Sequence, residues 1–106
     1  MSTFDKREAG FEKKFAHDEE MDFATEARAC KIFGLWIAEQ LNLEGDDAMT
    51  YAGTVIEANL EEPGFEDVFR KVRPDLKEKG VEISDHVLNV EMDKAVSEAR
   101  AQLASE

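Results

Sequence analysis

FATEARACKIFGLWIAEQL, residues 23–41, is the stretch that decides the fold of this 106-residue chain. Its apolar residues recur every three or four positions, a spacing that places them on one face of an α-helix. A helix with such a stripe is stable only against partners, so we expect other helices to cover it. The residues predicted to face the core are Phe23, Ala27, Cys30, Phe33, Ile37 and Leu41, with Gly34 beside them to admit a neighbouring helix.

After residue 41 the chain continues in helical pieces that are separated by turn residues. The breaks fall at Gly45, Pro63-Gly64, Pro74 and Gly80, and strand signals are almost absent. The chain is therefore predicted to be all-α, a small four-helix bundle with short loops. The further apolar stripes are Ala48, Ala52, Val55, Ile56, Asn59 and Leu60, then Phe65, Val68, Phe69, Val72 and Leu76, and finally Leu88, Met92, Ala95, Val96, Ala99 and Leu103.

Several residues mark the expected helix ends. Asp46 or Asp47 is predicted to cap the second helix by accepting from its free N–H groups. Pro74 has no N–H and restricts the residue before it, so the third helix should kink or end there. Ser84 is predicted to cap the fourth helix, with Ile83 and Leu88 placed as a hydrophobic staple around it.

The segment before residue 23 has an apolar stripe of its own, Phe4, Phe11 and Phe15. When this stripe is continued by three, four or seven residues, it meets carboxylates and not the core. A helix over residues 3–40 would be about 55 Å long at ~1.5 Å per residue, whereas a compact body of this size is about 30 to 35 Å across. The sequence therefore predicts a long first helix with an overhanging, partly disordered arm.

The arm is assigned to residues 1–18 and the bundle domain to residues 19–106. Gly10 weakens the arm as a helix by about 1 kcal/mol, and an isolated helix shorter than ~12–15 residues is marginal in water. We therefore expect the arm to fray when free and to fold on a partner. The alternative is that the arm folds back and buries its phenylalanines on its own bundle.

Charge and composition narrow the classes of partner. In residues 1–18 four basic side chains balance four acidic ones, so the whole net charge of −12 lies in residues 19–106. Nucleic acid and anionic membranes are disfavoured, because their binders carry basic patches. A single cysteine excludes an internal disulfide, and we see neither a signal peptide nor a membrane span. We expect a cytoplasmic or peripherally bound protein that is a monomer when free.

Few side chains offer chemistry of their own. His17 and Glu20 lie one helical turn apart, but the chain has too few histidines for a di-iron bundle, and a solvated acidic face is the expected role. Cys30 lies on the apolar stripe and is interpreted as a core residue. No catalytic residue and no metal site is predicted. The basic cluster Arg70-Lys71 with Arg73 is either an anion site or a solvated face that balances local acids.

Several blocks of residues together resemble the zeta inhibitor subunit of bacterial F-type ATP synthase. The resemblance extends from Phe4 to about Arg100 and is most pronounced in the first 40 residues and in EEPGFEDVFRK, residues 61–71. The blocks are Phe4-Asp5-x-Arg7-Glu8, Phe11-Glu12-x-Lys14-Phe15-Ala16-His17-Asp18, Glu26-Ala27-Arg28, Lys31, Gly34-Leu35-Trp36, Tyr51-Ala52, Glu62-Pro63-Gly64 and Glu66-Asp67-Val68-Phe69-Arg70-Lys71.

The resemblance implies a non-catalytic inhibitor whose arm wedges into the catalytic head of the ATP synthase, beside the rotor. There it would block the rotation that accompanies ATP hydrolysis while synthesis is spared, and the protein would be cytoplasmic, bound peripherally to the membrane-bound enzyme. Adenine nucleotide binding is also implied, without a residue to place it. The partner-binding residues carried over are Phe4, Asp5, Arg7, Glu8, Phe11, Glu12, Lys14 and Phe15.

Two other functions remain open from the residues alone. The acidic body could occupy a basic surface elsewhere, as an antitoxin or a nucleic-acid mimic does. The chain could also be a small adenine-nucleotide sensor. An enzyme is the least favoured class, since no nucleophile with a neighbouring base is found.

Overall fold

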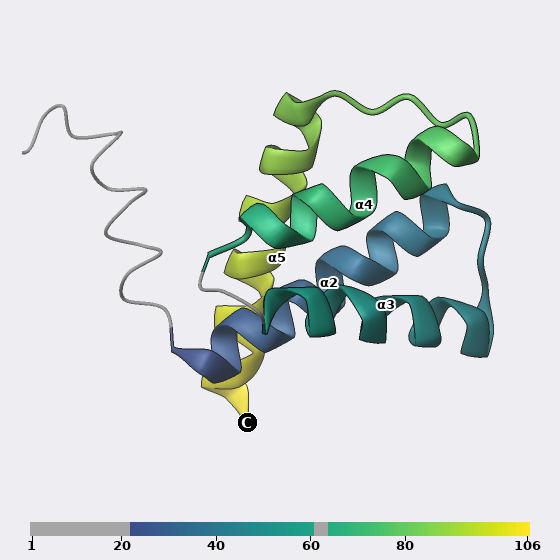
Figure 1. Ribbon diagram of the computed structural model, residues 1–106. Helices are drawn as coiled ribbons and strands as arrows, with labels where there is room; N and C mark the ends of the chain where they lie inside the picture. Colours follow the sequence, from purple (N-terminus) through teal and green to yellow (C-terminus); the bar gives the residue numbers. More distant parts are fainter. Residues whose placement is uncertain (1–21, 61–63) are drawn as a thin grey trace, which may run out of the picture.

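The computed structural model describes residues 22–60 and 64–106, and these form a helical body without a strand (Figure 1). The all-α fold class and the bundle predicted from the sequence are confirmed for this part of the chain. The helices are α2 (Phe23–Gln40), α3 (Gly45–Asn59), α4 (Glu66–Glu78) and α5 (Asp85–Ser105).

Helix α2 is the central element of the body. It packs against α3 and α5 and also touches α4, while α3 packs against α4 (Figure 1). Its side chains Phe33 and Ile37 are fully buried, and the Phe33 ring meets Phe69 of α4 edge-on, with centroids 5.8 Å apart at 89°. This geometry is favourable for aromatic pairs. The stretch that was predicted to organise the core therefore does so.

Gly34 allows α2 and α3 to approach closely. A Cβ atom at this position would lie 2.9 Å from the Cα of Ala52, a distance that real Cβ atoms do not reach. The predicted role of Gly34 is confirmed. Trp36, two residues on, is half-buried with its ring 6.1 Å from that of Phe33, so it packs at the edge of the core.

Cys30 is a core residue, as predicted. It is fully buried, and burial raises the pKa of its thiol to about 12. At neutral pH the side chain is therefore a neutral thiol, the unreactive form.

A polar cluster joins α3 to α4. The hydroxyl of Tyr51 donates to Asp75 Oδ2 at 2.7 Å, and Lys71 Nζ lies 2.8 Å from the same oxygen and 4.8 Å from the centre of the Tyr51 ring. Burial and the neighbouring carboxylate raise the pKa of Tyr51, which keeps the hydroxyl protonated as a donor.

The described part of the predicted long first helix is α2, which begins directly after Asp22. Asp22 has an extended backbone, with φ −82° and ψ 171°, and its carboxylate accepts from the backbone N–H of Thr25 at 2.9 Å. A side chain that caps in this way begins a helix. The 18 residues of α2 span about 27 Å, so α2 alone does not overhang the body. The predicted arm, residues 1–18, lies outside the described residues, and its division from residues 19–106 stays a prediction.

Helix α2 ends before Asn42, which is not among the predicted turn residues. Asn42 adopts a positive φ of 66°, and the N–H of Leu43 reaches back to the carbonyl of Ala38 at 2.9 Å. Helix α4 ends in the same manner at Gly80, where φ is 73° and the N–H of Val81 donates to Leu76 at 2.9 Å. Both ends are Schellman motifs, so the break predicted at Gly80 is confirmed.

The predicted cap of α3 is wrong. Its N-cap is Glu44, which makes no side-chain capping bond, while Asp46 and Asp47 lie inside the first turn. Carboxylates there still favour the helix, because the N-terminal end carries the positive pole of the dipole. Ser84 does cap α5, with its hydroxyl accepting from the N–H of Val87 at 3.2 Å.

Pro74 does not end the third predicted helix, since α4 runs through it to Glu78. Pro74 is exposed, so the Arg70 carbonyl that loses its donor lies on the face that water reaches. Continuing the helix brings Leu76 into the core, where it is buried. Burial of that side chain outweighs one missing hydrogen bond.

Two residues assigned to the core are instead exposed. The side chain of Phe23 is 65% exposed and that of Leu60 is 57% exposed. Phe23 is the first residue of α2, so it follows the same apolar period as Cys30 but lies at the end of the helix. Leu60 is the C-cap of α3 and points about 100° away from buried Asn59. The other predicted stripes are buried or half-buried in the described helices.

We predict that Gly34→Ala destabilises the body by about 1–3 kcal/mol, because the new methyl group would overlap the backbone of α3. Gly53→Ala is the matched control. That glycine lies on the exposed face of α3 with nothing within 4 Å of an added Cβ, and alanine there should stabilise by about 0.5–1 kcal/mol. Urea unfolding followed by circular dichroism measures both. A Gly34→Ala protein as stable as the parent would contradict the close approach.

Candidate functional site

The partner-binding residues predicted from the sequence all precede residue 22 and lie outside the described residues. They are Phe4, Asp5, Arg7, Glu8, Phe11, Glu12, Lys14 and Phe15. The structure does describe the place where this segment joins the body. We call that end of the body the arm base and define it by the first turns of α2, the end of α3 and the end of α5 (Figure 1).

The register of α2 on α3 brings their ends together at the arm base. Gly34 of α2 faces Ala52 of α3, and the two helices run antiparallel (Figure 1). Measured along the helix axes, Phe23 lies about 16 Å before Gly34, and Leu60 lies about 12 Å after Ala52. The N–H of Gly64 donates to Glu26 Oε2 at 3.3 Å, which ties the segment after α3 to the start of α2. The two exposed apolar residues therefore lie at the same end of the molecule.

Asp22 is the N-cap of α2 at the arm base. Hydrogen bonds from the amide and the hydroxyl of Thr25 lower the pKa of its carboxyl group. The capping contribution to stability is therefore complete above the ordinary carboxyl pKa and is lost as the pH falls through the lowered value. One of the carboxylates that interrupt the apolar stripe thus has a structural role as a cap.

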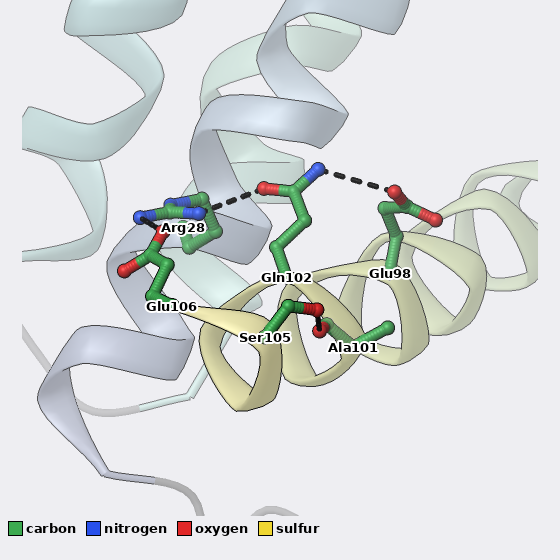
Figure 2. A network of polar contacts seen from close by, with 6 residues as sticks. All are labelled: Arg28, Glu98, Ala101, Gln102, Ser105 and Glu106. Atoms are coloured by element: carbon green, nitrogen blue, oxygen red, sulfur yellow. Dashed lines mark hydrogen bonds and ion pairs between the residues drawn. The ribbon is translucent and has the colours of Figure 1, made fainter.

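A polar network joins the start of α2 to the end of α5 (Figure 2). The guanidinium of Arg28 donates to Gln102 Oε1 at 2.8 Å and to Glu106 Oε2 at 2.9 Å, and Gln102 in turn donates to Glu98 at 3.1 Å. An ion pair this exposed contributes only about 0–1 kcal/mol. The main effect of the network is on position, because it holds the first turns of α2 against α5.

Phe23 and Leu60 are surface residues, contrary to the prediction from the apolar periodicity. Both follow the apolar period, which is why they were assigned to the core. The signals that distinguish them are their positions next to helix ends, after the cap Asp22 and before the break at Pro63-Gly64. A residue at the end of a helix can fit the apolar periodicity and still be exposed, because no neighbouring helix packs against it.

The basic cluster does not form a free anion site. Arg70 pairs with Asp67, Lys71 with Asp75 at 2.8 Å, and Arg73 with Asp85 at 2.9 Å. Each cation already has a carboxylate partner, so the cluster acts as a surface that balances local acids. The contacts therefore favour a solvated face over an anion site.

Open clefts are found on the surface of the described residues, and two of them are considered as ligand sites. The larger, of about 610 Å³, lies between the end of α4 and the start of α5 and is lined by Leu76, Lys77, Val81 and Ile83 among others. The smaller, of about 420 Å³, has Trp36 at its rim beside the acidic Glu39 and Glu44. The lining of the larger cleft includes basic side chains that could contact an anionic ligand, whereas the lining of the smaller cleft does not.

Neither a metal centre nor a membrane segment is found in residues 22–60 and 64–106. No three His, Cys, Asp or Glu side chains in these ranges are gathered so that they could hold a metal ion. None of the described helices is both long and apolar enough to span a bilayer.

The comparison with protein families gives one match over most of the sequence. The model of the family described as ATPase inhibitor subunit zeta matches residues 1–102, which includes both the predicted arm and the body. No curated protein matches the sequence significantly. The chain therefore belongs to the ATPase inhibitor subunit zeta family, whose members are regulatory, non-catalytic proteins.

Proposed function

We propose that this protein binds the catalytic head of F-type ATP synthase through residues 1–18 and stops ATP hydrolysis by obstructing rotation. The family supports the role of ATPase inhibitor, and its match begins at residue 1. The observation that carries the binding mode is the cap at Asp22. Because α2 begins after this residue, its core face begins there as well, and the stripe of Phe4, Phe11 and Phe15 precedes it in the sequence.

A wedge of this kind needs burial and no chemistry. Three phenylalanine side chains buried in a cleft would yield roughly 5–9 kcal/mol, at ~1.5–3 kcal/mol each. Fixing the backbone of the arm opposes this gain at about 1–2 kcal/mol per residue, so contacts beyond the three rings are needed as well.

The charges along the arm support docking beside the rotor. Asp5, Arg7, Glu8, Glu12 and Lys14 flank the phenylalanines with both signs, and residues 1–18 are neutral as a whole. The net charge of −12 belongs to the remainder. A neutral arm can enter a cleft without carrying the repulsion or attraction of the acidic body with it.

The proposed partners are the catalytic-head subunits and the rotor of the ATP synthase. The protein would be cytoplasmic, bound peripherally to the membrane-bound enzyme, and a monomer when free. As an inhibitor that acts by contact, it would require no cofactor.

Adenine nucleotide would bind, as a regulatory ligand, in the cleft of about 610 Å³ between α4 and α5. Its volume is in the range of small-molecule sites. Leu76 and Ile83 offer an apolar wall for a base, and Lys77 offers a cation for a phosphate. The lining also includes Glu82 and Asp85, of which Asp85 is already paired with Arg73. The smaller cleft is less suitable, since Glu39 and Glu44 would repel phosphate and no basic side chain of the described residues lines it.

Deleting residues 1–18 should abolish inhibition, because the wedge is removed while α2 and its cap remain. ATP hydrolysis by the cognate head, measured over a range of inhibitor concentrations, tests this. The circular dichroism of the shortened protein should still show a folded helical body. Equal inhibition by both forms would remove the arm from the mechanism.

Replacing Phe4, Phe11 and Phe15 together by alanine should weaken inhibition at least about 100-fold, which is the loss expected when two or more buried rings are removed. An acidic protein that covers a basic surface would behave in the opposite way. Its binding would survive the three substitutions and disappear with rising salt, because screening weakens contacts between exposed charges.

Adding ATP or ADP to isotope-labelled protein should shift the amide resonances of Lys77, Val81 and Ile83 more than those around Trp36. Lys77→Gln should weaken the response, whereas Lys94→Gln on α5 serves as a control outside the cleft. Shifts that cluster at Trp36, or no shift at millimolar nucleotide, would refute the placement.

A further inference from the structure

Phe23 and Leu60 are the most exposed large apolar side chains of residues 22–60 and 64–106, at 65% and 57%. Both belong to the arm base, as the register of α2 on α3 places them at the same end. The next, Met49, is 50% exposed and lies at the other end of α3. Single exposed apolar residues are common on protein surfaces. Two of them beside the predicted binding arm indicate a surface that another molecule covers.

We propose that Phe23 and Leu60 form a second docking surface, and that its occupant is the same protein that holds residues 1–18. The partner surface there would be apolar with a basic rim. This inference rests on the proposed function and adds to it a contact made by the body. Inhibitor binding would then have two linked parts, the arm and the arm base.

Chain connectivity identifies the occupant. Phe15 and Phe23 are eight residues apart, a span of about 12 Å as a helix and at most about 28 Å when fully extended. Any protein that buries Phe15 is therefore held within that distance of the arm base. Linked contacts of this type meet at a millimolar effective concentration, so even a weak second surface is used.

The charges around the arm base define the rim of the partner. Asp22, Glu57 and Glu106 are exposed there, and so is Arg100, whose charge acts on Asp22. Arg28 is only partly exposed and is already paired with Glu106, so acidic groups outnumber basic ones. The body as a whole is strongly acidic. A complementary surface would present lysine or arginine around an apolar pocket, which also steers the encounter.

The arm base is held in place before any partner arrives. Asp22 caps α2, Glu26 accepts from Gly64, and Arg28 joins α2 to the end of α5 (Figure 2). Two apolar side chains on a fixed support lose little backbone freedom when they are covered. Pre-organisation of this kind lowers the entropy lost on binding.

The test compares Phe23→Ser, Leu60→Ser and the double variant with Met49→Ser as the matched control. Inhibition of ATP hydrolysis by the cognate head is titrated with each full-length protein. Substitutions at the arm base should raise the half-inhibitory concentration about tenfold each, whereas Met49→Ser should leave it unchanged. Thermal unfolding should be similar in all variants, since the replaced side chains are exposed.

The other outcomes overturn the inference. A double variant that inhibits as the parent does would remove the arm base from the interface. Stronger inhibition by the double variant would mean that the surface stores the chain's own residues 1–21. A parent dimer, seen by analytical ultracentrifugation and lost in the double variant while inhibition is unchanged, would assign the surface to a second copy.

The protein without residues 1–18 separates this inference from the proposed function. If the shortened protein inhibits as well as the parent does, the proposed function fails whatever the arm base does. If shortening abolishes inhibition and the double variant has no effect, only the second docking surface fails.

Discussion

The contact between Gly34 of α2 and Ala52 of α3 is the constraint on which the rest of the body depends. An added Cβ at Gly34 would meet the Ala52 backbone at 2.9 Å, so no other residue fits there without displacing a helix. Close approach fixes the register of the central helix. With that register set, Phe33 meets Phe69 of α4, and the start of α2 lies beside the end of α3. The arm base is therefore a consequence of packing in the middle of the bundle.

The two ends of the body differ in a manner that suits a regulatory protein. At one end, α2 and α4 stop in Schellman motifs at Asn42 and Gly80, and the chain turns back with its backbone groups satisfied. At the other end, polar contacts hold α2 and α5 together while Phe23 stays exposed. The chain belongs to the ATPase inhibitor subunit zeta family, which supports the role of an ATPase inhibitor. Cys30 is buried as a neutral thiol in the core.

The helical stripes were predictable because they depend on local periodicity. Val68, Val72, Leu88 and Met92 are buried where the pattern placed them. Helix ends were harder, since several residues compete to cap or to stop a helix. Pro74 continues α4 because tertiary burial of the next turn outweighs the local cost, and Asp46 and Asp47 lie within the first turn of α3 without capping it. The candidate partner-binding residues, Phe4 to Phe15, remain predictions because they lie outside the described part of the chain.

The sequence by itself determined the helical class, the residues available for the core and the family to which the chain belongs. These properties depend on residue type and on spacing along the chain, which any reader of the sequence can measure. Only the tertiary structure decided that Phe23 and Leu60 are surface residues and that Asp22 begins α2. The physical reason is that burial requires a neighbouring helix of sufficient length. The position at which a neighbouring helix ends is a property of the assembled bundle, and the periodicity of one helix does not contain it.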